Sequence, residues 1–165
     1  MLQLAICIVI AVCDQISKFL ILTRVLPGED IPVIDSFFSI TFGKNTGAAW
    51  GIMQGFNDWL VILSMFVVIS LLIFRRHFFE NTVVHRVTLG LMAGGILGNL
   101  IDRIKHGYVI DFLDFYNCTY HFPAFNIADS AICIGVALYI ISVYVAEHKK
   151  LKSGKNVDKP VKSQV

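Results

Sequence analysis

Two aspartates, Asp111 and Asp129, are the side chains whose type and setting most clearly allow chemistry. Both lie in the stretch Val109–Ser130, each has apolar neighbours, and the stretch leads into a long apolar segment. A carboxylate beside lipid is costly, so one placed there usually has a partner or a function. Two aspartates that share a proton can activate a water for attack on a carbonyl and then protonate the leaving amine. The pair therefore indicates acid–base hydrolysis at a membrane surface.

The same two residues also allow a purely structural interpretation. Asn126 precedes Asp129 by three residues, so the two could form a reciprocal cap at a helix start, where the helix dipole favours a charged carboxylate. Asp111 lies between Ile110 and Phe112, apolar surroundings that should raise its pKa. One carboxyl held neutral and one held charged is what acid–base catalysis needs. From the residues alone, a catalytic pair and a cap beside an unrelated aspartate both stay open.

The composition indicates a membrane protein. The chain has 165 residues, of which 56% are hydrophobic and only 16% charged, against roughly 25% charged in soluble domains. About 20 apolar residues in a helix cross the hydrocarbon core of a bilayer. We expect an all-α protein of four membrane helices at about 2–22, 58–74, 87–101 and 127–146. They would form one domain, 1–146, followed by a disordered basic tail, 147–165.

The basic residues predict the orientation. Arg75, Arg76 and Arg86 flank the connection after the second segment, and the tail carries six lysines, together nine of the fourteen Lys and Arg. The positive-inside rule then places both termini and this connection in the cytoplasm. The connections at 23–56 and 102–126 would face outward. Asp14, roughly 18 Å along the first helix, would lie toward the same outer side as the two aspartates.

Other polar residues fall on shared helix faces. Asp14 and Lys18 are four residues apart, so they should pair, either as an anchor for the helix or as support for a site. Small residues at 90, 94 and 98 form a helix-packing face. An adjacent face of the same helix carries Gly95, Asn99 and Arg103. Ordinary glycine packing and a functional site explain that second face about equally well.

The first outward connection carries two further patterns. Residues 38–42 alternate apolar and polar side chains, which predicts a half-buried strand. A run of small residues after Asn45 ends in Trp50, and such a run lets the backbone approach another group closely. A plain turn beside an interfacial tryptophan would give the same pattern.

At the level of motifs the chain resembles the lipoprotein signal peptidase (signal peptidase II) family, the aspartic membrane proteases of bacterial lipoprotein maturation. Five blocks in the right order carry the resemblance, which extends from about Leu2 to Ala146. They are Asp14-Gln15-x-Ser17-Lys18, Asn45-Thr46-Gly47-Ala48-Ala49-Trp50, Gly94-Gly95-x-x-Gly98-Asn99-x-x-Asp102-Arg103, Val109-x-Asp111-Phe112 and Phe125-Asn126-x-Ala128-Asp129-Ser130.

The resemblance implies roles for these residues. Asp111 and Asp129 would be the catalytic pair, with no metal and no cofactor. Asn45 would contact substrate. Because water must also reach the pair, we expect a polar notch there, rimmed by Asn45, Asn99 and Asn126. Residues that would bind substrate, line the site or support it are Asn45, Gly95, Asn99, Arg103, Asn126, Asp14 and Lys18.

It also implies a fold, a substrate and a location. The family fold is four transmembrane helices with a small extracytoplasmic β-cradle and a short interfacial helix. The substrate would be a prolipoprotein whose cysteine carries diacylglycerol, cut just before that cysteine. We expect a monomer in contact with membrane lipid, no nucleic-acid partner, and the bacterial cytoplasmic (inner) membrane, with the active site at the extracytoplasmic face.

Three other functions fit parts of the sequence. A metal-dependent membrane hydrolase could use His106 and His121, although no metal-ligand spacing such as HExxH occurs. A thiol oxidase would need a close outward pair of cysteines, whereas only Cys118 is expected outside. A non-enzymatic transporter or scaffold could also hold intramembrane charges, but these cluster at one face instead of forming a path across.

Overall fold

The computed structural model describes residues 1–48, 52–79 and 82–157. Its helices are α1 (Leu2–Arg24), α2 (Asn57–Phe78), α3 (Val83–His106) and α4 (Ile127–Val157). All four are long and apolar enough to cross a bilayer. Its strands are β1 (Asp30–Ile34), β2 (Phe38–Asn45), β3 (Val109–Asn117) and β4 (Tyr120–His121). The expected membrane helices and small sheet are confirmed.

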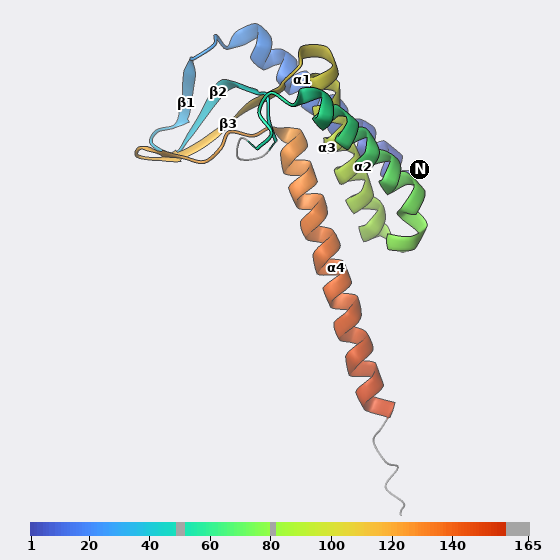
Figure 1. Ribbon diagram of the computed structural model, residues 1–165. Helices are drawn as coiled ribbons and strands as arrows, with labels where there is room; N and C mark the ends of the chain where they lie inside the picture. Colours follow the sequence, from blue (N-terminus) through green and yellow to red (C-terminus); the bar gives the residue numbers. More distant parts are fainter. Residues whose placement is uncertain (49–51, 80–81, 158–165) are drawn as a thin grey trace, which may run out of the picture.

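The strands gather at the end of the bundle where α1 ends and α4 begins (Figure 1). They pair antiparallel in the order β1-β2-β3-β4. The expected strand at 38–42 is β2, which continues to Asn45, and β3 beside it was not predicted as a strand. A shift in register between Ile40 and Gly43 places Gly43 opposite Asp111.

The short interfacial helix is not among the described residues, where 52–55 form turns and the only helices are the four long ones. Ala49 and Trp50 of the small-residue block lie outside the described residues. Helix α3 is longer than expected at both ends because Thr82 caps it by accepting a hydrogen bond from the His85 N–H, and Gly107 (φ 79°) ends it.

Helix α4 runs past its expected end at 146 to Val157, so residues 147–157 of the expected basic tail continue the helix. Glu147, Leu151 and the lysines there are good helix formers, which lets the helix continue beyond its apolar part. Residues 158–165 lie outside the described residues. Figure 1 shows this end of α4 extending well beyond the other helices.

Helix α3 is the central helix of the bundle and contacts α1, α2 and α4. Its glycines make the close approaches: a Cβ on Gly90 would lie 2.8 Å from the carbonyl of Gln3, and one on Gly94 2.8 Å from that of Cys7, both in α1. A Cβ on Gly95 would meet the carbonyl of Ala128 in α4. The predicted small-residue face is therefore a packing face.

A small apolar core joins the end of α1 to the sheet. It consists of Ile21 of α1 and Val25 directly after that helix, with Ile110 and Phe112 of β3, all buried. These two β3 side chains flank Asp111 in sequence. The core therefore fixes the position of Asp111 relative to α1.

Candidate active site

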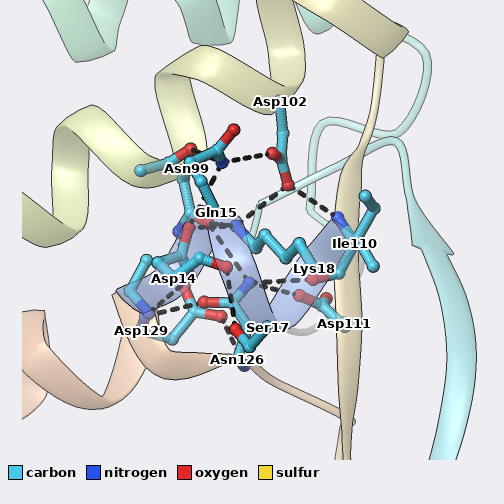
Figure 2. Close-up of polar contacts among 12 residues, drawn as sticks. Asp14, Gln15, Ser17, Lys18, Asn99, Asp102, Ile110, Asp111, Asn126 and Asp129 are labelled. Atoms are coloured by element: carbon cyan, nitrogen blue, oxygen red, sulfur yellow. Dashed lines mark hydrogen bonds and ion pairs between the residues drawn. The ribbon is translucent and has the colours of Figure 1, made fainter. Parts of the chain in front are cut away.

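Asn126 links the two aspartates. Its side-chain amide donates to Asp111 Oδ1 at 2.7 Å, and its side-chain oxygen accepts from the Asp129 N–H at 2.9 Å. The same amide also lies 3.2 Å from the carbonyl oxygen of Ile110. The Asn126 side chain is fully buried. One asparagine thus holds a carboxyl from β3 and the first turn of α4 in a fixed relation (Figure 2).

Asp129 takes part in the predicted cap and in the site at once. Its Oδ2 accepts from the Asn126 N–H at 3.2 Å, which completes the reciprocal cap. Its other oxygen, Oδ1, accepts from the Asn99 amide of α3 at 2.7 Å. The predicted cap is therefore present, and it is compatible with a catalytic role, because it orients Asp129 and leaves one carboxylate oxygen in contact with Asn99.

A second amide group, from the neighbouring strand, donates a hydrogen bond to Asp111. Asn45 at the end of β2 donates to Asp111 Oδ2 at 2.9 Å and accepts from the Gly47 N–H at 2.9 Å. Arg103 of α3 donates to the Gly47 carbonyl at 2.7 Å, which ties this turn to the helix. A Cβ on Gly43 would lie 3.1 Å from the Asp111 carbonyl, so glycine gives β3 room there.

Behind the aspartates lies a buried ionic cluster. Lys18 Nζ lies 2.9 Å from Asp14 Oδ2 and 2.9 Å from Asp102 Oδ2, and it donates to Asn99 Oδ1 at 2.8 Å. Asp14, Lys18 and Asp102 are each 1% exposed or less. Such buried charges need partners, and here each carboxylate meets the ammonium directly. The cluster orients Asn99, whose amide contacts Asp129 (Figure 2).

Asp102 and Gln15 are parts of this cluster to which sequence reasoning gave no role. The Gln15 amide donates to Asp102 Oδ1 at 2.8 Å, and Asp102 Oδ2 accepts from the Ile110 N–H at 3.1 Å. Asp102 thus fixes the backbone one residue before Asp111. A signal was available in the sequence, because Asp102 follows Asn99 by three residues and so shares its helix face.

The pKa of Asp111 is raised from 3.8 to about 7. Burial is the largest cause, because it disfavours the charged carboxylate, and the negative charge of Asp129 adds to it. The amides of Asn45 and Asn126 and the charge of Lys18 act in the opposite direction. A carboxyl with this pKa can hold a proton near neutral pH and give it up in a reaction.

Both aspartates line a cavity of about 740 Å³. Asn45, Asn99 and Arg103 contribute polar groups, and Ile132 and Cys133 extend the wall along α4. Residues 122–125 form an apolar part of the wall, and of these only Phe125 belongs to one of the motif blocks. A space of this size with a few convergent polar groups suits a ligand with a polar reacting centre and apolar parts.

The expected site residues lie close together, but two of them occupy positions that differ from the expected ones. Asn126 does not rim the cavity as expected, because it is fully buried behind the aspartates. Gly95 does not line the cavity either, and it packs against Ala128 at the start of α4. Asp14 and Lys18 lie in the ionic cluster, and Asn45, Asn99 and Arg103 line the cavity.

The two histidines that a metal-dependent hydrolase could use lie away from the cavity. His106 at the end of α3 is exposed, and His121 on β4 pairs with Asp114 at 2.8 Å; neither lines the cavity. The four cysteines are free, and Cys118 is exposed at the turn between β3 and β4. The buried charges cluster at one end of the bundle, which does not favour a transport path.

Comparisons with known proteins converge on one family. The family model described as signal peptidase (SPase) II matches residues 6–145. A lipoprotein signal peptidase of Bacillus velezensis is 38% identical over 150 residues, covering 91% of this chain and 98% of that relative. One of Bacillus subtilis is 38% identical over 152 residues, covering 92% and 99%.

Two solved structures are also similar to this chain. A bacterial membrane enzyme structure obtained by the in meso method at 2.3 Å has a TM-score of 0.78 and 34% identity, covering 99% of this chain and 93% of that one. A second bacterial membrane enzyme structure, at 1.9 Å, has a TM-score of 0.75 and 38% identity, covering 86% and 91%.

Proposed function

The chain belongs to the signal peptidase II family, and we propose on that premise that it is an aspartic endopeptidase whose catalytic pair is Asp111 and Asp129. It removes the signal peptide from prolipoproteins whose cysteine carries diacylglycerol, cutting just before that cysteine. The observation that carries the proposal is the pair itself, held by one buried asparagine at the wall of a 740 Å³ cavity. The metal-dependent hydrolase and the transporter are not favoured.

In the proposed reaction the two carboxyl groups have different roles. Asp129, oriented by its cap and by Asn99, is charged and takes a proton from water as the water oxygen attacks the scissile carbonyl carbon. Asp111 is protonated at rest and gives its proton to the leaving nitrogen as the carbon–nitrogen bond breaks. The proton on Asp129 then returns to Asp111 and restores the resting state. The pKa of about 7 at Asp111 supports this assignment.

The surrounding residues have supporting roles in this proposal. Asn45 and Arg103 would contact the substrate backbone from the cavity wall, and Asn99 would orient Asp129. Asn126 positions both aspartates from behind. Asp14 and Lys18 hold Asn99 in place, and Gly95 lets α4 approach α3 closely enough for the contact.

We further propose that the protein works as a monomer in the bacterial cytoplasmic membrane with both termini inside. The arginines at the end of α2 and the start of α3 lie at the opposite end of the bundle from the aspartates, which supports an extracytoplasmic active site. The exposed apolar side chains of α1, α2 and α4 would contact lipid. Residues 1–146 would form the peptidase domain, with the end of α4 in the cytoplasm.

The test is cleavage of a diacylglyceryl-modified prolipoprotein by the wild type, Asp111→Asn and Asp129→Asn. Each substitution keeps the shape and removes a titrating group, so both variants should lose nearly all activity while the wild type is unaffected by a metal chelator. Ser130→Ala, which alters another residue at the cavity wall, is the matched control and should keep its activity. Full activity of either aspartate variant would contradict the catalytic assignment. Loss of wild-type activity in the presence of the chelator would favour a metal-dependent hydrolase instead.

A further inference from the structure

A second cavity, of about 300 Å³, lies at the end of the bundle away from the aspartates. It forms where α1 begins, α2 ends and α3 begins. From Arg86 to Asn99 along α3 is about 20 Å at 1.5 Å per residue, so this cavity is separate from the proposed active site. The polar residues that line it are Gln3, Arg75, Arg76, His85 and Arg86.

Three arginines line this cavity, and none of them is paired with a carboxylate among the described residues. Arg75 and Arg76 are exposed, whereas Arg86 is half-buried and its Nε has no hydrogen-bond partner among the described residues. A buried donor left without a partner is costly, so a ligand that accepts from it would be favoured.

Two further polar groups at the cavity have no partner in the part of the chain that the structure describes. His85 is 7% exposed, and its Nε2 lies 2.8 Å from the Ser142 hydroxyl. Because that hydroxyl donates to the Tyr139 carbonyl, its oxygen accepts from the Nε2–H of His85. Nδ1 of His85 is then an acceptor without a partner in the described chain, and so is the buried Oε1 of Gln3. Both can accept from the hydroxyl groups of a head group, while the donors for its phosphate are the arginines. An arginine that only anchored its helix at the interface would extend away from the protein, as snorkelling side chains do, whereas Arg86 is half-buried and its Nε is buried.

We propose that this cavity binds a phosphate-bearing anion, and that its source is the head group of an anionic phospholipid. Arginine presents several N–H donors in a planar fork that fits phosphate oxygens. The cavity lies at the membrane ends of three helices, and exposed Ile73 and Phe74 precede the arginines on α2, where acyl chains would run. Basic pockets between transmembrane helices on the cytoplasmic side are suited to such head groups.

The test measures phosphatidylglycerol binding by native mass spectrometry of protein released from nanodiscs of phosphatidylglycerol and phosphatidylcholine. The wild type should retain phosphatidylglycerol in preference to phosphatidylcholine. Arg75→Gln/Arg86→Gln should lower its affinity about tenfold, since two charge-assisted contacts are lost. The matched control Lys149→Gln/Lys152→Gln removes the same charge from exposed positions on α4 and should keep the wild-type affinity.

Competition identifies the source of the phosphate. Displacement of the lipid only by other anionic phospholipids supports the head group, whereas displacement by inorganic phosphate alone would overturn the lipid source and keep the anion site. The site itself would be overturned if the arginine variant bound phosphatidylglycerol as tightly as the wild type. It would also be overturned if the arginine and lysine variants lost affinity for this lipid equally. Prolipoprotein cleavage at the wild-type rate shows that each variant is folded, and Arg75→Gln alone, at an exposed position, should give a smaller loss.

Discussion

Asp14 in the middle of α1 accepts a hydrogen bond from the Ala128 N–H at 2.9 Å, although 114 residues separate them in the chain. The first N–H groups of a helix have no partner inside the helix, so this carboxylate satisfies one of them at the start of α4. Gly98 lies between the two helices, where a Cβ would come within 2.6 Å of Asp14 Oδ2. The backbone of Ala128, the residue before Asp129, is therefore held by α1. Substitutions in α1 should consequently alter the position of the proposed catalytic pair.

Removing the cation from the ionic cluster should be strongly destabilising. Lys18→Met would leave Asp14 and Asp102 buried without their ammonium partner, at a cost of about 3–5 kcal/mol, as for other broken buried pairs. It would also free the Asn99 side chain, so cleavage should fall. Thermal unfolding in detergent and the cleavage assay measure the two effects.

Lys105→Met is the control for that experiment. Lys105 is exposed, and its ammonium donates to the Gln15 side-chain oxygen at 3.5 Å, so its loss should change the unfolding free energy by about 0.5 kcal/mol or less. Equal melting temperatures for the two lysine variants would show that the cluster does not stabilise the bundle.

Cleavage should decline as the pH rises through about 7. Below its pKa of about 7, Asp111 holds the proton that the leaving nitrogen needs, and above it that proton is lost. Asn45 donates to the charged form of Asp111 and lowers its pKa, so Asn45→Ala should move the alkaline limb to higher pH, by up to about one unit. The pH dependence of kcat/KM measures this.

Ser130→Ala again serves as the control, because Ser130 lines the same cavity but its hydroxyl donates to the Asn126 carbonyl. Its alkaline limb should stay at the wild-type position. A shift of the Asn45→Ala limb to lower pH would contradict the role of Asp111 as the protonated partner.

The raised pKa of Asp111 also predicts how stability changes with pH. Because the folded protein binds this proton more tightly than the unfolded chain, Asp111 contributes most to the unfolding free energy below about pH 4. That contribution is lost as the pH rises through about 7. Asp111→Asn should therefore flatten the decline in melting temperature between these pH values. If the decline is unchanged in this variant, other groups cause it.

A methyl group on Gly95 should separate α3 from α4. Its Cβ would meet the Ala128 carbonyl and lie 2.7 Å from Ile132 Cγ1, and the backbone contact cannot be relieved by a rotamer change. Gly95→Ala should lower stability by about 1–3 kcal/mol, as overpacking does, and displace Asp129 enough to cut activity at least tenfold.

Gly135→Ala tests the same two helices at a position farther from Asp129. There a Cβ would lie 2.7 Å from Met92 Cγ, which belongs to a flexible side chain that can move aside. This variant should keep most of its activity. Equal losses in the two glycine variants would mean that helix packing in general, and not the position of Asp129, limits activity.

The orientation can be tested with a native cysteine. Cys118 is exposed at the turn between β3 and β4, at the end of the bundle that carries the aspartates. A membrane-impermeant maleimide added to intact spheroplasts should label the wild type rapidly, and Cys118→Ser should lose this rapid labelling. Rapid labelling of Cys118 only after the cells are opened would place the sheet and the aspartates in the cytoplasm.

The apolar segments and the spacing of polar residues were enough to predict the four helices and the contacts within single helices. Long apolar runs can satisfy their backbone groups in lipid only as helices, which is why four helices could be placed from composition. The spacing of Asp14 to Lys18 and of Asn126 to Asp129 predicted the pair and the cap, because both are contacts within one helix. The ends of helices were less certain, since α3 begins at its Thr82 cap and α4 continues past its apolar part.

Only the tertiary structure decided which distant residues meet. The approach of Lys18 to Asp102, of Asn45 to Asp111 and of Asn126 to both aspartates depends on how the sheet packs on the helix ends. Local periodicity contains no information on such contacts, because they form between elements that are far apart in the chain. The apolar cavity wall at 122–125 and the burial of Asn126 behind the aspartates have the same origin.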